Sequence, residues 1–415
     1  MAGSPIPTNE RVNESPSRRH FVVNAVAAGT LLLTSCKAPA DTPAPARTWL
    51  RKPDEKPFQI PNDFLGIHTD HGMGGPTPAP SYRYGAVRSI NANDERAFPI
   101  TQWALIELKD NEFDWSPVEK WLAANPGKTK IFNLFGCPTF HQKFPKEPWA
   151  FPYLQGGGSP PKDPALAARF IKALLAKFPG EIQFIELWNE PNFGWDNDDL
   201  LKARWGPTKG LPAFFTGSPA DLAGMARAVR EVLPKEVLLM SSGWEGQGNF
   251  DSSKNSLLRF SKAPDGRGRT GKDHVQALSV HSYTYENDPN KLVNELLGYR
   301  ERFEEAGYDP SLPRFLTEVG AEAPGAWNKD TPSMTQKTTA IRRWCMIPAA
   351  LGYSGVYLYK HSVLETLGDP AANPEISKAI DDIYEQLSGK RIKAAAELKD
   401  DTIWLQFDDD SELRA

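Results

Sequence analysis

Two glutamates, each placed directly after an apolar segment, carry the clearest chemical signal in the sequence. Glu190 follows residues 184–189 and precedes Pro191, which prevents a strand from continuing. Glu318 follows the short strand-like segment 314–317, which contains Phe315 and Leu316, in a similar way. Hydrolysis of a glycosidic bond needs two carboxyl groups, one to protonate the leaving oxygen and one to attack or to activate water. A fold that brings these two glutamates together across a cleft would therefore be able to hydrolyse a sugar linkage.

The elements that must position the two glutamates alternate between short apolar runs and amphipathic segments. The apolar runs predict eight strands, at residues 64–68, 86–90, 130–135, 182–189, 237–241, 277–283, 314–319 and 355–360. Predicted helices lie at residues 115–124, 164–178, 219–233, 291–306, 335–351 and 374–387. This alternation favours an α/β fold, a (β/α)8 TIM barrel whose reactive groups stand at the carboxyl ends of the strands. Strands four and seven, which carry the glutamates, lie across the barrel mouth from each other.

Polar side chains next to the two glutamates are candidates for binding the substrate. Asn189 stands beside Glu190 and has an amide that can hold a substrate hydroxyl. His281 and Tyr283 share one face of the sixth predicted strand, because side chains alternate along a strand. From that face Tyr283 can donate a hydrogen bond to Glu318 and keep it ionised. The alternative for each residue is a core polar group with satisfied hydrogen bonds.

The two glutamates need opposite protonation states, and nearby charges can provide them. Arg88, on the second predicted strand, can lower the pKa of Glu318 through its charge and can contact substrate. Glu190 must stay protonated near neutral pH, which requires a drier setting or a nearby negative charge. Glu186 shares a strand face with Glu190, and an interior glutamate there can pair with Arg88.

The segments that contain the glutamates are Trp188-Asn189-Glu190-Pro191 and Thr317-Glu318-Val319-Gly320. They resemble the acid/base and nucleophile motifs of the clan A glycoside hydrolases. Further segments, over roughly residues 62–390, resemble glycoside hydrolase family 39, the β-xylosidase and iduronidase group. These segments are Val87-Arg88, Trp103, Ile106-Glu107, Phe113-Asp114-Trp115, residues 184–192 and Val280-His281-Ser282-Tyr283.

The resemblance implies that Glu190 is the general acid/base and Glu318 the nucleophile of a retaining hydrolase. It implies a carbohydrate substrate, a β-linked oligo- or polysaccharide, and neither a cofactor nor a metal. Two alternatives use the same fold: a catalytically inactive carbohydrate-binding lipoprotein, and a transglycosidase with the same residues. Glu322, in the loop after the seventh strand, is a competing carboxylate that ranks below Glu318.

The chain departs from the family pattern at three places. Leu108 stands where the family usually has a proline after Ile-Glu. The eighth strand ends at residues 357–361 without the tryptophan that many clan members place beneath the bound sugar. The third strand ends at residues 135–139 without the common Pro-x-Trp form. These differences bear on the substrate more than on the chemistry.

Three further residues near strand ends are candidates for sugar contacts. His68 ends the first predicted strand, and Trp195 and Trp244 follow the fourth and fifth. Tryptophan rings can stack on a sugar, although packing in the core explains the two tryptophans equally well. His68 and His71 lack a third ligand at a recognisable spacing, so we predict no metal site.

The first part of the sequence resembles an export signal. Arg18-Arg19 forms a twin-arginine pattern, the apolar run 21–33 follows it, and Leu33-Thr34-Ser35-Cys36 resembles the bacterial lipobox. We therefore expect residues 1–36 to be a signal peptide with lipidation at Cys36. The protein would be exported and held at a membrane, in the periplasm or at the cell surface. An ordinary cleaved signal or a chance cysteine is the alternative.

The remaining segments complete the predicted organisation. Residues 37–61 contain six prolines and predict an extended linker, and residues 62–390 predict the barrel. Residues 391–415 predict short strands with a turn at 408–410, either a hairpin appended to the barrel or the start of a small β-domain. Cys137 and Cys345 are expected to be buried free thiols, with a disulfide as the alternative. Lys and Arg number 48 against 52 Asp and Glu, so no basic surplus indicates a nucleic-acid partner.

Overall fold

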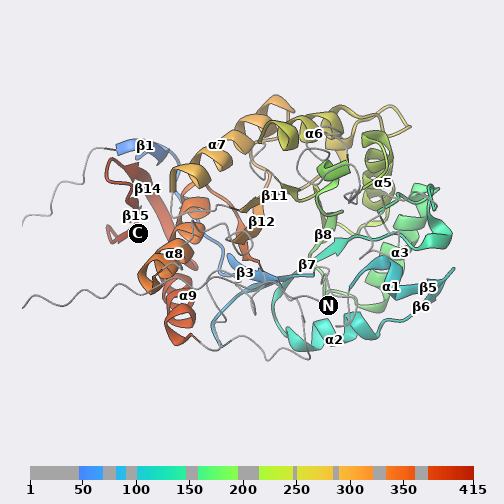
Figure 1. Ribbon diagram of the computed structural model, residues 1–415, viewed down its shortest axis with the longest axis horizontal. Helices are drawn as coiled ribbons and strands as arrows, with labels where there is room; N and C mark the ends of the chain where they lie inside the picture. The colour runs from blue at the N-terminus through green and yellow to red at the C-terminus, as the bar shows by residue number, and fades with distance from the viewer. Residues whose placement is uncertain are drawn as a thin grey trace, which may run out of the picture. The chain divides into compact units, whose positions relative to one another are not determined.

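A ring of parallel strands forms the centre of the molecule (Figure 1). The computed structural model describes residues 46–68, 81–89, 101–145, 158–194, 215–245, 250–283, 289–320, 333–359 and 373–415. Within these residues the eight predicted strands are present, as β3 Leu65–His68, β4 Ala86–Arg88, β7 Thr129–Leu134, β8 Phe184–Leu187, β9 Leu238–Met240, β11 Leu278–Tyr283, β12 Arg314–Gly320 and β13 Gly355–Leu358.

The order of the strands closes the ring. Apart from β9 and β11, each of the eight strands pairs in parallel with the next along the chain, and β13 pairs with β3. The ring closes between β9 and β11 through an isolated parallel bridge from Met240 to Ala277 and through β10, Trp244–Glu245, which pairs with β11. The predicted (β/α)8 barrel is therefore confirmed.

The helices lie outside the ring of strands (Figure 1). Their bounds are α1 Trp103–Ile106, α2 Ser116–Ala124, α3 Pro164–Lys177, α5 Pro219–Val232, α6 Phe250–Lys262, α7 Pro289–Glu305, α8 Met334–Ala350 and α9 Pro374–Leu387. α5 begins with a capping box: the Asp221 amide donates to Ser218 Oγ at 3.2 Å, and the Ser218 amide donates to Asp221 Oδ2 at 2.9 Å. The sequence pattern did not predict α6, nor the single turn of α1.

The interior of the barrel is layered. At the end where the strands begin, side chains from several strands form an apolar cluster: Ala86, Ile131, Phe184, Met240, Ala277, Phe315 and Tyr357. Two residues further along β11, Ser279 begins a polar layer, and His281 lies two residues beyond it. Because alternate residues of a strand face the same side, this taper places polar groups at the carboxyl ends of the strands.

A second, antiparallel sheet joins the two ends of the described chain (Figure 1). It contains β14 Arg391–Leu398, β15 Ile403–Phe407 and β16 Glu412–Arg414, which confirms the predicted C-terminal strands. β1 Ala46–Arg51 and β2 Phe58–Gln59 also pair with β14. The sheet packs against α8, so it is neither a lone hairpin nor a separate domain.

The linker predicted over residues 37–61 is therefore wrong from Ala46 onward. The linker prediction rests on the six prolines of this segment. They lie at 39, 43, 45, 53, 57 and 61, and they leave residues 46–52 free of proline. No proline interrupts the hydrogen bonding of that stretch, which pairs with β14 as β1.

The two cysteines lie within the described residues, whereas the N-terminal segment does not. Cys137 and Cys345 are free and buried, as expected. The signal peptide, Cys36 and residues 37–45 lie outside the described residues. Among the described residues, no helix is long and apolar enough to cross a bilayer.

Candidate active site

The fold brings Glu190 and Glu318 together from β8 and β12. A carboxylate oxygen of each and a ring nitrogen of His281 all lie within 4.8 Å of one another. Glu318 is 2 % exposed and Glu190 is 7 % exposed. Two carboxyl groups from non-neighbouring strands thus share one small, nearly dry volume.

The loop that carries Glu190 has an unusual backbone. Trp188 has a φ of 68° and Glu190 a φ of 43°, in the left-handed region that residues other than glycine rarely adopt. Such residues cost about 1–3 kcal/mol each, and they persist where the surroundings hold them. The Glu190 amide donates to the Gly243 carbonyl at 3.1 Å, and Asn189 forms a parallel bridge with Gly243.

Packing of Trp188 helps to hold this loop. Its indole is fully buried, with the ring of Phe135 at 5.4 Å and the ring of Phe215 at 4.9 Å, both edge-on. Edge-to-face aromatic pairs contribute about 0.5–1.5 kcal/mol beyond the burial of their area. Burial of this side chain therefore offsets the backbone strain and directs Glu190 toward Glu318.

Arg88 joins three acceptors beneath the pair. Its guanidinium donates from Nη1 to Glu318 Oε1 at 2.6 Å, from Nε to Glu186 Oε2 at 2.6 Å, and from Nη2 to Asn189 Oδ1 at 2.7 Å. Burial acts to lower the pKa of Arg88, but the charges of Glu186 and Glu318 outweigh it and the pKa rises. Arg88 is therefore a permanent buried cation, and the predicted contact with Glu186 is present.

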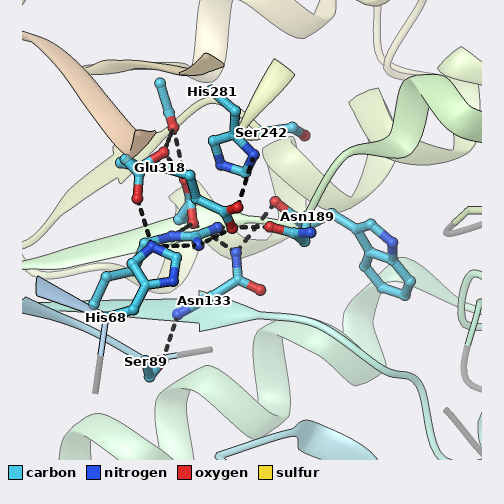
Figure 2. A network of polar contacts seen from close by, with 12 residues as sticks. His68, Ser89, Asn133, Asn189, Ser242, His281 and Glu318 are labelled. Carbon is cyan, nitrogen blue, oxygen red and sulfur yellow. Dashed lines mark hydrogen bonds and ion pairs between the residues drawn. The ribbon is translucent and has the colours of Figure 1, made fainter. Parts of the chain in front are cut away.

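Tyr283 and His281 complete the surroundings of the pair, and Figure 2 shows His281 above Glu318 and Asn189. The Tyr283 hydroxyl donates to Glu318 Oε2, as predicted. His281 Nδ1 lies 2.8 Å from Glu190 Oε1 and 3.7 Å from Glu318 Oε2. Burial, and then the charge of Arg88, hold the pKa of His281 well below its usual range, so its imidazole is neutral.

The surroundings give the two glutamates different protonation states. Burial and the charge of Glu318 raise the pKa of Glu190 well above its usual range. Burial also raises the pKa of Glu318, but Arg88 and the Tyr283 hydroxyl oppose that rise. Arg88 lowers the pKa of Glu318, as predicted, although burial raises that pKa by more. Within the described part of the chain, Glu318 contacts a cation and Glu190 does not, so the proton that the pair retains resides on Glu190.

A third carboxylate, Glu186, lies beneath the pair. Besides the Arg88 contact, its Oε2 accepts from Asn133 Nδ2 at 2.6 Å, and its Oε1 accepts from Ser279 Oγ at 2.6 Å and Thr317 Oγ1 at 3.0 Å. Asn133 and Thr317 were not predicted as site residues. The available signal was one amide within the apolar run 131–135 and one hydroxyl directly after Phe315 and Leu316.

Other predicted site residues lie deeper than expected. His68 is fully buried, and its Nε2 lies 2.6 Å from the Thr317 carbonyl, which can only accept (Figure 2). Arg88 and His281 are fully buried as well: His281 contacts the two catalytic carboxyl groups, and Arg88 contacts Glu186, Glu318 and Asn189. Asn189, 6 % exposed, donates from Nδ2 to Glu190 Oε2 at 3.3 Å.

Of the two tryptophans that are candidates for sugar stacking, Trp244 lies within the described residues and Trp195 does not. Trp244 is fully buried and its ring lies 5.8 Å from that of Phe260, so it packs in the core and offers no face to a sugar. The prediction of a stacking role for Trp244 is therefore wrong, because β10 turns this side chain into the protein rather than toward the strand ends. Trp195, His71 and Glu322 lie outside the described residues.

A second group of potential metal ligands already holds a cation. Atoms of Glu107, Asp110 and His141 lie within 4.8 Å of one another. Arg169 Nη2 stands among them, at 2.6 Å from Glu107, 2.7 Å from Asp110 and 2.9 Å from His141. The guanidinium thus occupies the position that a metal ion would need. Glu107, part of the family-like Ile-Glu segment, is a buried structural residue that also accepts from Trp103 Nε1 at 2.6 Å.

Comparison with solved structures identifies the fold. SrfJ from Salmonella typhimurium has a TM-score of 0.55 and 14 % identity over 91 % of both chains. An endo-β1,6-glucanase has a TM-score of 0.52 and 14 % identity over 86 % of this chain and 85 % of its own. A family 39 glycoside hydrolase from Bacteroides cellulosilyticus WH2 has a TM-score of 0.50 and 15 % identity over 84 % of this chain and 68 % of its own.

The chain shares its barrel fold with glycoside hydrolases. One of these neighbours belongs to family 39, the family that the sequence motifs resemble. At such low identity the likeness establishes the fold alone. No protein-family model matches the chain, and neither does any curated protein. The chemistry must therefore be argued from the site.

Proposed function

We propose that this protein is a retaining glycoside hydrolase. The observation that carries the proposal is a pair of buried carboxyl groups, with oxygens within 4.8 Å, of which only Glu318 contacts the buried cation Arg88. Retaining glycosidases hold their two carboxyl groups about 5–5.5 Å apart, whereas inverting enzymes need about 6.5–9.5 Å to admit a water. The separation in this site supports double displacement.

In the first step, Glu318 Oε attacks the anomeric carbon while Glu190 gives its proton to the departing oxygen. Tyr283 and Arg88 each donate to one oxygen of Glu318, which holds the carboxylate ionised and oriented. The bond from the anomeric carbon to the leaving oxygen breaks, and a glycosyl ester on Glu318 forms.

In the second step, Glu190 acts as a base. It is now a carboxylate, and it removes a proton from a water that attacks the anomeric carbon and releases Glu318. Among the described residues, His281 Nε2 has no hydrogen-bond partner. A buried N–H without a partner is costly, so the proton belongs on Nδ1, which donates to Glu190 Oε1. The transferable proton of Glu190 then resides on Oε2.

The substrate that we propose is a β-linked oligo- or polysaccharide. This choice rests on the resemblance of the motifs to the β-xylosidase and iduronidase group and on the neighbouring endo-β1,6-glucanase. The chain departs from the family pattern at the ends of the third and eighth strands, so a panel of sugars is needed to find the substrate.

The test combines hydrolysis of aryl β-glycosides of several sugars with substitution of the nucleophile. Glu318→Ala should lower kcat by about 10⁴-fold or more, because no group remains to form the covalent ester. Azide should restore turnover and yield a glycosyl azide of inverted configuration, since it enters from the face that Glu318 vacates. Glu112→Ala, at a solvent-exposed glutamate paired with Lys109, is the matched control and should retain full activity.

Full activity in Glu318→Ala would overturn the assignment. Sugar binding without hydrolysis of any glycoside by the wild-type protein would favour the carbohydrate-binding alternative. Transfer to an added sugar acceptor in preference to water would identify a transglycosidase.

A further inference from the structure

The buried carboxylate of Glu186 lies near the pair and has no part in the two steps of the reaction. It is fully buried, and four donors satisfy both of its oxygens. No contact joins it to Glu190 or Glu318; its connection to Glu318 runs through Arg88, whose Nε binds Glu186 while Nη1 binds Glu318. A charged group in the lowest polar layer of the barrel is costly to bury unless it is paired, as this one is.

We infer that Glu186 is a positioning residue that fixes the Arg88 guanidinium and, through its negative charge, makes Glu190 hold its proton. This inference rests on the proposed glycosidase function. Arg88 engages three separate acceptors with three different nitrogens, and Glu186 takes the one at Nε. Without that contact the guanidinium is free to rotate and to bind both oxygens of Glu318, which would compete with Tyr283 and weaken the nucleophile.

The groups that face Glu186 determine how its charge acts. On the described strands, Arg88 on β4 contacts Glu186, and Tyr357 on β13, Glu318 on β12 and Glu190 after β8 are within reach of its charge. His68 on β3 contacts Arg88, and His281 on β11 contacts Glu190. β7 contributes the neutral Asn133, and β9 contributes the apolar Met240. Tyr357 stays protonated because burial raises its pKa well above the usual range. Arg88 stays a cation, and Glu186 is its partner at 2.6 Å.

The sign of the effect follows from electrostatics. A fixed negative charge disfavours ionisation of nearby carboxyl groups, and Glu186 acts in this direction on the pKa of both Glu190 and Glu318. Loss of that charge leaves Arg88 uncompensated and lowers both pKa values. In a retaining glycosidase the acid limb of the pH–activity profile reports the pKa of the nucleophile, and the alkaline limb reports the pKa of the proton donor. Both limbs should therefore shift toward lower pH.

The test is Glu186→Gln, which removes the charge but can keep the hydrogen bonds. Its carbonyl oxygen can accept from Arg88 and Asn133, and its amide can donate to the hydroxyls of Ser279 and Thr317, which can reverse roles. We expect the two limbs of the kcat/KM profile for an aryl glycoside to move toward lower pH by about one unit. Circular dichroism and thermal unfolding verify that the variant is folded.

Two further variants separate charge from structure. Glu186→Asp keeps the charge and should lose activity through misplacement of Arg88, with both limbs unmoved. Ser279→Ala removes one hydrogen bond to Glu186 and keeps the charge, and should also leave the limbs in place. If Glu186→Gln is folded and its limbs coincide with those of the wild type, Glu186 is only structural and the inference is wrong.

The outcome stays decisive if Glu186→Gln does not fold. A full-unit shift in Glu186→Asp or Ser279→Ala would then show that the charge of Glu186 does not set the profile. Absence of hydrolysis by the wild-type protein would instead refute the proposed function, which distinguishes the two failures.

Discussion

Glu190 and Glu318 have the same side chain and acquire different roles from their immediate neighbours. Glu318 binds Arg88 and Tyr283, whereas Glu190 meets the neutral His281 and the amide of Asn189. Among the described residues Arg88 is the cation that contacts this group of carboxylates, and its one charge cannot balance those of Glu186, Glu318 and Glu190 together, so the group retains a proton. The division into acid and nucleophile thus follows from which carboxyl group lies out of reach of the guanidinium.

A residue outside the catalytic pair predicts how stability depends on pH. Glu295 on α7 accepts a hydrogen bond from Ser282 Oγ at 2.5 Å, and burial raises its pKa to about 7 despite that bond. The folded protein therefore keeps this group protonated at pH values where the unfolded chain ionises it. The stability that this group contributes is fully present below about pH 4.5 and is lost as the pH rises through about 7. The loss amounts to at most about 3 kcal/mol.

Glu295→Gln removes that penalty and should be more stable than the wild type at pH 8. The two proteins should have nearly equal free energies of unfolding in urea at pH 4.5. Glu301→Gln, at an exposed position of the same helix, is the control and should show no pH-dependent difference. An equal difference between Glu295→Gln and wild type at both pH values would contradict the prediction.

At the scale of elements, the sequence predicts what depends on local periodicity and misses what depends on distant partners. All eight strands and six helices were predicted, because an apolar run or an apolar stripe marks a buried face. α6 was missed because its sequence begins with the polar run Asp251-Ser252-Ser253-Lys254. β1 was missed because its hydrogen-bonding partner, β14, lies more than three hundred residues later in the chain.

The catalytic residues also divide into features that local sequence predicts and features that depend on distant contacts. Both glutamates were predictable, since each follows an apolar strand at its carboxyl end. The left-handed backbone at Trp188 and Glu190 was not predictable, because neither residue is a glycine and the strain is held by contacts with Gly243 and Phe215. The burial of Trp244 was equally hidden, because its place after a strand does not show which way its ring turns.

Gly243 supports a prediction about the element that aligns the acid. Its carbonyl accepts from the Glu190 amide, and a Cβ at this position would lie 2.6 Å from His281 Cε1 and closer still to Nε2. Gly243→Ala should push the imidazole away from Glu190 and lower kcat by about 10²-fold, because displacements near 1 Å have effects of this size.

The matched control is Gly224→Ala on α5, where the added methyl would contact only the Pro164 ring, at 3.3 Å. An alanine favours a helix over a glycine, so this variant should keep its activity and gain slightly in stability. Wild-type kcat in a folded Gly243→Ala protein would show that the contact between Gly243 and His281 does not position the acid.

At the scale of the whole molecule, the first described strand and the last ones share one sheet. β1 places Trp49 opposite Ala396, and the ring of Trp49 meets the edge of Trp404 at 6.4 Å between centroids. Leu50 is 4 % exposed and belongs to the main hydrophobic core. Because the sheet packs on α8, this pairing fastens the outer layer of the barrel to segments from both ends of the described chain.

Two truncations test whether β1 contributes to stability. Removal of residues 1–43 leaves the compact unit that begins at Ala44, so its free energy of unfolding should match that of the full chain within about 0.5 kcal/mol. Removal of residues 1–52 deletes β1, uncovers the edge of β14 and exposes core around the former position of Leu50. We expect a loss of at least about 2 kcal/mol and a tendency to aggregate through the open edge.

A point substitution separates the packing of β1 from its backbone pairing. Leu50→Ala keeps every hydrogen bond between β1 and β14 and should cost about 2–4 kcal/mol in urea unfolding, without aggregation. If the chain that lacks residues 1–52 unfolds at the same urea concentration as the chain that lacks 1–43, β1 is a passive addition to the sheet. The barrel and β14 to β16 would then be stable without it, and the contribution assigned to this pairing would be wrong.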